Sequence, residues 1–273
     1  MKHAEEMGTD RRESVSRFVD THSHLDDAAF AIDLDQVLER SMAAGVRSWL
    51  NVGYCPERWK STIVLGNRYP GVAVMLGLHP SEADRWTADL EEDLVALLKQ
   101  SGARAVGEIG IDLFRGETNL DQQRAVFERQ LAIAVDLQVP AVIHMRGAEP
   151  EILKSLRAMT VLPRLLLHSF DGGPDLVAFI NETGSFVGVG GLFTRPASHR
   201  LRDQLSRIAR DRIVLETDSP YLVPAGVSGR RNEPRNLAII GSAVAKELGL
   251  TVEHLAELTT NNAERLFGAL EPA

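Results

Sequence analysis

Two histidines separated by one residue, His22 and His24, are the first feature of the chain that could bind a metal ion. They lie in the stretch DTHSHLD, residues 20–26, where the predicted short strand 17–20 ends. Alternate side chains of a strand point to one face, so both imidazoles would lie on the same side. Two converging imidazoles are half of a metal site. Alone, however, such a pair would more often be two solvated histidines on a surface strand.

Further polar residues that could take part in such a site follow other apolar segments that are typical of strands. They are His79, Glu108, His144, His168 and Asp218. Each of them alone would more often be a core or turn residue. Together with His22 and His24, however, they place five of the eight histidines at predicted strand ends, and such clustering favours metal binding.

Four of these histidines, with Glu108 and Asp218, are too many ligands for one tetrahedral ion. They fit two divalent cations that share a bridging carboxylate, for which Glu108 is the natural candidate. A pair of cations can activate water and offset the charge that develops on a phosphoryl or carbonyl oxygen. The ligand set therefore predicts hydrolase chemistry.

Alternating strands and helices are predicted along the whole chain. We expect strands at 17–20, 46–53, 71–77, 103–112, 140–143, 164–167, 185–189 and 212–215, and helices at 33–44, 56–69, 89–100, 120–137, 150–158, 176–181, 199–210, 236–248 and 252–267. Asp89 and Glu92 resemble an N-terminal capping signature of the third helix. The pattern predicts a single (β/α)8 TIM barrel, in which the carboxyl ends of the strands surround one mouth. An open doubly wound sheet is the alternative.

Composition predicts an ordinary globular protein with one domain, the barrel at 17–273, after a mobile tail at 1–16. Apolar residues make up 44% and charged residues 25% of the 273 positions. The single cysteine, Cys55, and the lack of an apolar leader suggest a reduced, cytoplasmic setting, and no apolar run reaches the roughly 18 residues of a membrane span. The net charge of −8 argues against coating a polyanion, so a nucleic acid would have to be held locally, for example by bound cations.

A family resemblance connects these motifs. The chain resembles the TatD family of metal-dependent deoxyribonucleases, a branch of the amidohydrolase-like barrels. The matching segments are 20–26, 77–80, 107–112, 144–146, 168–170, 216–221, 231–234 and 262–267. They run in order from about Phe18 to Phe267 and so cover nearly the entire chain.

The resemblance implies a centre of two divalent metal ions (Mg, Mn or Zn) and cleavage of DNA phosphodiester bonds. It assigns His22, His24, Glu108 and Asp218 to the first metal, and Glu108, His144 and His168 to the second. Asp218 would also orient or deprotonate the attacking water. The implied polarity is that of a 3′–5′ exonuclease. Because the net charge leaves no long basic surface for a duplex, we expect single-stranded or frayed DNA ends as the substrate. We also expect the protein to work as a monomer.

Substrate contacts are predicted on less specific signals. Arg146 could bind a phosphate or form a strand-end salt bridge, and His79 could touch substrate or stabilise the turn at Pro80. Asp112 could support a ligand from behind. The remaining substrate-binding candidates, Arg231, Asn232 and Glu233, lie in a loop after the last strand and could contact DNA or be solvated.

Two departures from the family pattern and one alternative function remain. Asp171 occupies a position where the family often has serine, and the segments 188–195 and 223–230 match less clearly, so we expect these loops to set substrate preference. The alternative is hydrolysis of a small amide, lactone or ester by the same centre. Glu108 favours the nuclease, because several such amidohydrolases use a carboxylated lysine as the bridge.

Overall fold

The computed structural model of the protein describes residues 17–114 and 119–273. The predicted mobile tail at 1–16 lies outside the described residues. Eight parallel strands form one sheet in the order β1 to β8. They are β1 (Phe18–Ser23), β2 (Val46–Gly53), β3 (Val72–Leu76), β4 (Val106–Asp112), β5 (Ala141–Arg146), β6 (Leu165–Leu167), β7 (Phe186–Val189) and β8 (Ile213–Leu215).

The sheet closes where the segment after β8 meets the end of β1. Ser23 bridges Ser219 in parallel, and the backbone N–H of Asp218 donates to the carbonyl of His22 at 2.9 Å. The predicted (β/α)8 barrel is therefore confirmed, and the open doubly wound alternative is wrong, because consecutive strands are neighbours throughout.

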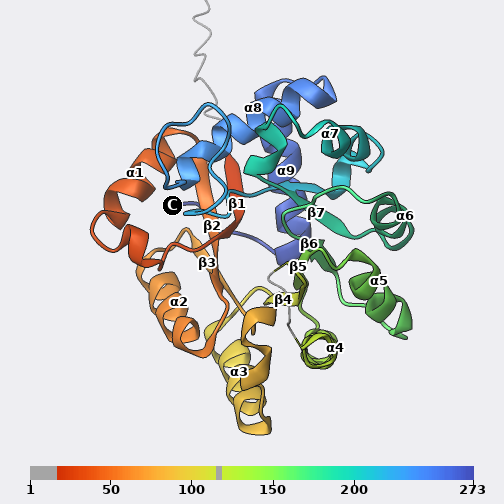
Figure 1. The fold of residues 1–273 in the computed structure, drawn as a ribbon. Coiled ribbons are helices and arrows are strands. Elements are labelled where there is room, and N and C mark those ends of the chain that lie inside the picture. The colour runs from red at the N-terminus through yellow and green to blue at the C-terminus, as the bar shows by residue number, and fades with distance from the viewer. Residues whose placement is uncertain (1–16, 115–118) are drawn as a thin grey trace, which may run out of the picture.

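Helices surround the barrel and cover the outer face of the sheet (Figure 1). They are α1 (Leu34–Ala43), α2 (Pro56–Arg68), α3 (Ala88–Ser101), α4 (Leu120–Asp136), α5 (Glu149–Ala158), α6 (Pro174–Thr183), α7 (His199–Leu205), α8 (Leu237–Leu248) and α9 (Val252–Phe267). Short 3-10 helices interrupt the loops: η1 (Ala28–Phe30), η2 (Pro80–Arg85), η3 (Gly191–Thr194), η4 (Arg210–Arg212) and η5 (Pro234–Asn236). None of the helices in the described ranges is long and apolar enough to span a lipid bilayer.

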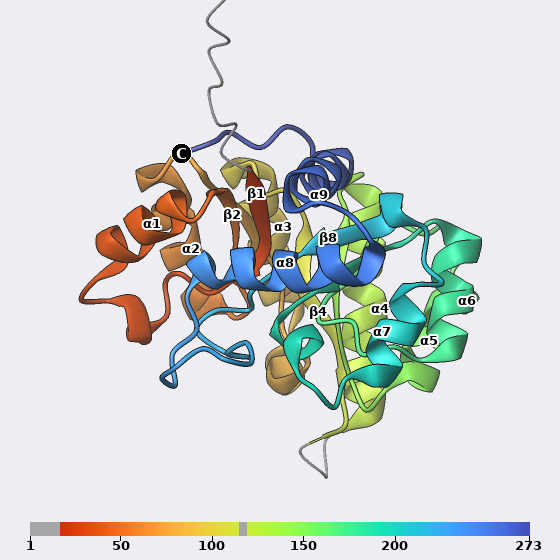
Figure 2. The same cartoon turned by 90° about the horizontal axis from the view of Figure 1, so that it is seen from above.

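Two apolar layers hold the barrel together. One lies between the sheet and the surrounding helices. The other fills the interior, where side chains such as Val19, Leu50 and Val142 pack against Leu266 and Phe267 of α9. Because α9 packs on the interior residues, it closes one end of the barrel, and Figure 2 shows it at the same end as the C-terminus. The opposite end is the mouth, at the carboxyl ends of the strands.

Two strands are longer than predicted, and both carry candidate ligands. β1 continues to Ser23, so His22 belongs to the strand itself. β5 continues to Arg146, because Ile109–Asp112 of β4 pair with Ile143–Arg146. The polar residues hid this extension in the sequence, since the predicted strand stopped where the apolar run stopped.

Helix boundaries also differ from the prediction: α6 extends two residues further at each end, to Pro174–Thr183, and two other differences have a clear physical cause. Thr87, not Asp89, caps α3, and its hydroxyl accepts a hydrogen bond from the N–H of Leu90 at 3.1 Å. The seventh helix ends at Leu205 instead of near Arg210. After Leu205 the backbone tightens into turns with bonds to the third preceding residue, from Arg207 to Gln204 and from Ile208 to Leu205.

Candidate metal centre at the mouth of the barrel

The end of β1 and the segment after β8 place three candidate ligands side by side. His22 is fully buried and His24 nearly so. The Nε2 atom of His24 lies 3.2 Å from Oδ1 of Asp218, and that of His22 lies 3.7 Å from the same oxygen. The three side chains offer ligand atoms that all lie within 4.8 Å of one another. These are three of the four residues that the family resemblance assigns to the first metal site.

Asp20, which the sequence reasoning did not single out, connects the same two segments. Its carboxyl group accepts from the backbone N–H of Thr217 at 2.8 Å and contacts the Thr217 hydroxyl at 2.6 Å. Burial raises the pKa of Asp20 to about 8, although its hydrogen bonds with Thr217 oppose this shift. Asp20 therefore supports the backbone that presents Asp218.

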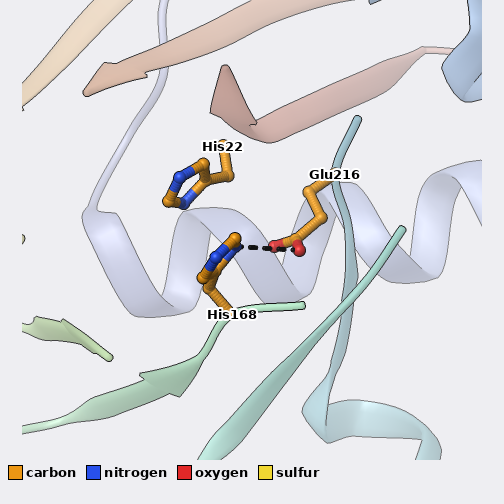
Figure 3. Close-up of side chains that lie close together, drawn as sticks. All are labelled: His22, His168 and Glu216. Carbon is orange, nitrogen blue, oxygen red and sulfur yellow. Dashed lines mark hydrogen bonds and ion pairs between the residues drawn. The ribbon is translucent and has the colours of Figure 1, made fainter. Parts of the chain in front are cut away.

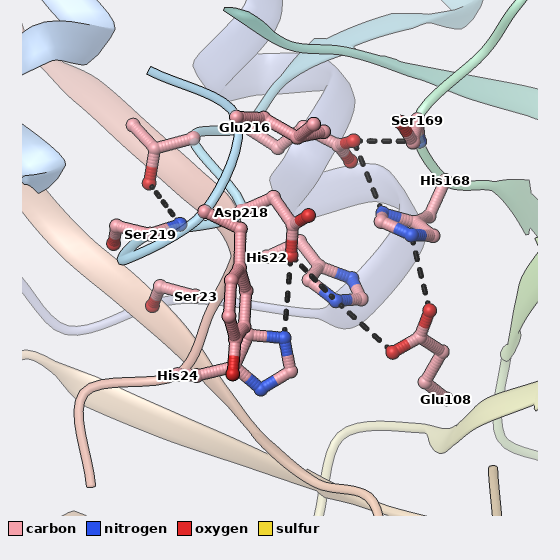
Figure 4. A network of polar contacts seen from close by, with 12 residues as sticks. His22, Ser23, His24, Glu108, His168, Ser169, Glu216, Asp218 and Ser219 are labelled. Atoms are coloured by element: carbon pink, nitrogen blue, oxygen red, sulfur yellow. Dashed lines mark hydrogen bonds and ion pairs between the residues drawn. The ribbon is translucent and has the colours of Figure 1, made fainter. Parts of the chain in front are cut away.

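Glu108 of β4 contacts three histidines from other parts of the barrel, and Figure 4 shows it facing two of them, His22 and His168. Its Oε1 is 2.7 Å from Nδ1 of His144 and 3.0 Å from Nε2 of His168. Its Oε2 is 3.5 Å from Nε2 of His22. Glu108, His144 and His168 form a second group of converging ligand atoms. One carboxylate thus faces both predicted metal sites, as a bridging ligand must.

The electrostatics of this cluster favour cations. Among the described residues, the ion-pair partners of Glu108 and Asp218 are histidines only. Burial opposes ionisation of Glu108, but the surrounding histidines outweigh it and hold its pKa well below the usual range. Conversely, burial lowers the pKa of His22. Both ring nitrogens of His22 and Nδ1 of His24 are buried without a hydrogen-bond partner in the described structure. Such a nitrogen and oxygen donor set fits divalent metal ions.

Asp112 and His79 lie directly beside this cluster. Oδ2 of Asp112 is 3.1 Å from Nε2 of His144, and this hydrogen bond lowers the pKa of Asp112 to about 2. His144 is therefore held between two carboxylates, Glu108 and Asp112. The ring of His79 lies 4.5 Å from that of His144, and its Nδ1 accepts from the N–H of Ser81 at 3.1 Å at the start of η2. His79 thus stabilises the turn, which leaves its contact with substrate as a prediction.

Arg146 is exposed at the end of β5, two residues beyond His144. Its guanidinium lies over the ring of Phe114, 3.7 Å from the centroid. Phe114 is itself 67% exposed. The described contact is therefore a cation–π pair and not the strand-end salt bridge that the sequence offered as the alternative. Phosphate binding by Arg146 stays a prediction.

The described contacts of the predicted cluster Arg231, Asn232 and Glu233 lie outside the group of histidines. Arg231 pairs with Asp33 at 2.7 Å and with Glu233 at 2.8 Å. The fully buried Asn232 donates from Nδ2 to the carbonyl of Thr217 at 2.9 Å, and Glu233 also pairs with Arg40. The cluster is thus neither simply solvated nor bonded to the histidines, and it fastens the loop after β8. Its contact with substrate stays a prediction.

Glu216 is a site residue that the sequence reasoning missed. It is fully buried, and its Oε1 lies 3.1 Å from Nδ1 of His168 (Figure 3). A signal was present, because Glu216 and Asp218 have the same one-residue separation as His22 and His24. The predicted strand before Glu216 is confirmed, but the prediction gave a role to Asp218 alone.

Comparison with known proteins identifies the family. The 3′-5′ ssDNA/RNA exonuclease TatD of Citrobacter koseri is 33% identical over 251 residues, which cover 90% of this chain and 96% of that protein. The metal-dependent hydrolase YabD of Bacillus subtilis is 30% identical over 91% of this chain and 98% of its own length. The crystal structure of YJJV, a TatD homologue from Escherichia coli, superposes with a TM-score of 0.87 at 28% identity and covers 93% of this chain and 99% of that chain. Residues 19–268 match the model of the TatD related DNase family, so the chain belongs to that family, as the motifs predict.

Proposed function

We propose that this protein is a metal-dependent 3′–5′ exonuclease that acts on single-stranded or frayed DNA ends. The observation that carries the proposal is the position of Glu108, which faces both ligand groups in a chain of the TatD related DNase family. Two divalent cations would be held by these groups. The first would take His22, His24, Glu108 and Asp218, and the second Glu108, His144 and His168.

The bound cations would polarise the scissile phosphate and lower the pKa of a water molecule. Asp218 would orient that water and accept its proton, because its carboxylate lies at the mouth beside His24. His79 would donate a hydrogen bond to a phosphate oxygen. Burial lowers its pKa to about 4, so it is neutral at pH 7, and because Nδ1 accepts from Ser81, its proton is on Nε2. Arg146 would bind a second phosphate oxygen at the rim.

Two exposed aromatic rings support a single-stranded substrate. Phe114 follows β4 and is 67% exposed, and Tyr221 follows β8 and is 48% exposed. In an eight-stranded barrel these two strands are on opposite sides, so the rings flank the mouth from two directions. Unpaired bases stack on such rings, whereas a duplex keeps its bases stacked internally. The net charge of −8 adds to this preference, because the chain cannot rely on its overall charge to hold a duplex.

Hydrolysis of a small amide, lactone or ester is not favoured. The chain has a glutamate at the bridging position, and the relatives that cover it almost completely carry nuclease or hydrolase names. A cytoplasmic location and a monomeric state remain predictions. Light scattering of the purified protein would test the monomer.

The test of the function is digestion of DNA labelled at its 5′ end, with Mg²⁺, Mn²⁺ or Zn²⁺ added to metal-free protein. We expect a ladder of products that shortens from the 3′ end of linear single strands, and no products without a divalent ion. A closed single-stranded circle of the same sequence is the control. Its digestion at the rate of the linear strand would rule out an end-dependent enzyme, and full activity of metal-free protein in chelator would rule out the metal mechanism.

A further inference from the structure

We propose that Glu216 is a positioning residue that fixes the orientation and tautomer of His168, and that Gly188 is a glycine in order to leave room for it. This inference rests on the proposed metal centre, in which His168 is a ligand of the second cation. It assigns a role to a buried carboxylate and to a glycine that the proposed mechanism does not use.

One oxygen of Glu216 holds both the ring and the backbone at the end of β6. Its Oε1 accepts from Nδ1 of His168 at 3.1 Å and from the backbone N–H of Ser169 at 2.6 Å. This contact keeps a proton on Nδ1 of His168 and turns the Nε2 atom toward the cluster, where it lies 3.0 Å from Oε1 of Glu108. This is the arrangement in which a histidine binds a metal through one nitrogen and is oriented through the other.

Ser169 gives a second reason for this contact. Its φ of 49° lies in the left-handed region, which is unfavourable for a residue with a side chain. The hydrogen bond from its N–H to Glu216 stabilises this conformation. Glu216 therefore supports both the ligand ring and the strained turn that follows it.

Gly188 of β7 lies directly against the carboxylate. A Cβ atom at this position would be 1.9 Å from Oε2 of Glu216 and 2.6 Å from its Cδ, so any other residue would displace the side chain. The backbone itself does not require glycine here, because Gly188 does not have a left-handed φ. The space for Glu216 is thus the physical reason for glycine on this strand.

Glu216 also lies close to a ligand of the other cation. Oε2 of Glu216 and Nδ1 of His22 are both buried without a partner in the described structure. The rings of His22 and His168 stack with centroids 3.9 Å apart, and the two histidines and Glu216 offer ligand atoms within 4.8 Å of one another (Figure 3). Glu216 therefore lies beside one ligand of each proposed site, and it forms a direct hydrogen bond with one of them, His168.

The experiment compares cation binding by metal-free, full-length variants, measured by calorimetric titration with Mn²⁺. We expect Glu216→Ala and Gly188→Ala to weaken the site that contains His168 by about 10- to 100-fold, the usual effect of losing such a partner. Glu216→Gln keeps the volume and one hydrogen-bond acceptor, so this variant should lose less cation affinity. Gly190→Ala is the matched control. It lies two residues from Gly188, and its Cβ would meet Glu216 at an ordinary 3.5 Å.

A second measurement distinguishes positioning from general damage. Nitrogen NMR of the histidine rings should show Nδ1 of His168 protonated in the wild type and in Gly190→Ala, and partly unprotonated in Glu216→Ala. If the folded Glu216→Ala protein bound both cations as the wild type does, with an unchanged His168 tautomer, the positioning role would be wrong while the nuclease could still be active. A wild type that binds no cation would overturn this inference together with the metal centre.

Discussion

The two ends of this barrel are built from the same strands but treat polar groups differently. At the closed end, Asn262 of α9 donates to the carbonyls of Arg210 and Ile213 at 2.9 and 2.8 Å, and Phe267 is buried among apolar side chains. At the mouth, three ring nitrogens of His22 and His24 are buried without a described partner, whereas the described part of the closed end has Nε of Arg17 and Oγ of Ser101 in this state. Unsatisfied buried polar atoms are costly, so their concentration at the mouth indicates that function and not stability selects them.

The backbone shows a related difference. Gly102 and Gly184, which precede strands at the closed end, end their helices in the left-handed region, where glycine has no steric penalty. At the mouth the same region is occupied by further glycines but also by residues with side chains, among them Ser169 and Asp218. Gln138, before β5, is one such residue at the closed end. Packing at the closed end thus stabilises a backbone at the mouth that would be unfavourable by itself.

The largest effect should follow from removing the carboxylate that both ligand groups share. We expect Glu108→Ala to reduce cleavage by at least about 10³-fold, because several kcal/mol of transition-state stabilisation depend on the cation pair. The thermal midpoint should change little, since Glu108 lies outside the apolar interior. Glu264→Ala, which removes a carboxylate paired with Arg17 at the closed end, should keep full activity. A Glu108→Ala protein with more than a tenth of wild-type activity would show that catalysis at the mouth does not depend on this carboxylate.

At the closed end we expect a substitution to lower stability and to leave activity unchanged. Phe267 is 4% exposed, and Phe267→Ala should lower the free energy of unfolding by about 3 kcal/mol or more through lost burial and a cavity. Urea unfolding measures this change. Activity per folded molecule should stay at the wild-type level, and Phe267→Leu should lower the free energy of unfolding by less. A large loss of kcat without a loss of stability would show that the two ends are not independent.

A smaller effect should come from the rim of the mouth. Arg146→Ala should raise KM for single-stranded DNA by roughly tenfold while kcat changes less, as expected if the guanidinium binds phosphate equally in the ground and transition states. Arg146→Lys should restore only part of the affinity, because lysine lacks the planar fork. Arg164→Ala, at the closed end, is the control. An unchanged KM in folded Arg146→Ala protein would leave the contact with Phe114 as its role.

The smallest effect should come from the ion pairs that fasten the loop after β8. The hydrogen bond from Arg231 lowers the pKa of Asp33 to about 2 from an ordinary value of 3.8. A depressed carboxyl pKa stabilises the fold above the ordinary value, and this stability is lost as the pH falls towards 2. Arg231→Met should therefore lower the free energy of unfolding by no more than about 1 kcal/mol at pH 7 and by less near pH 2.5.

The same variant tests the predicted substrate contact of Arg231. If the arginine only fastens the loop, KM for single-stranded DNA should stay within about twofold of the wild type. A clearly raised KM with a small change in stability would instead place the residue in contact with DNA.

The sequence by itself determined the barrel and the six metal-ligand candidates, because strand and helix periods are local and parallel strands present their carboxyl ends at one mouth. His22, Glu108 and Asp218 could be placed from their strands alone. The tertiary structure was needed for contacts that depend on which strands are neighbours and on how side chains turn. Glu216 meets a histidine 48 residues earlier, Gly188 is explained only by that carboxylate, and Asn232 is buried although its loop is polar. No local pattern names the partners of these residues, since each contact joins segments that only the closed barrel brings together.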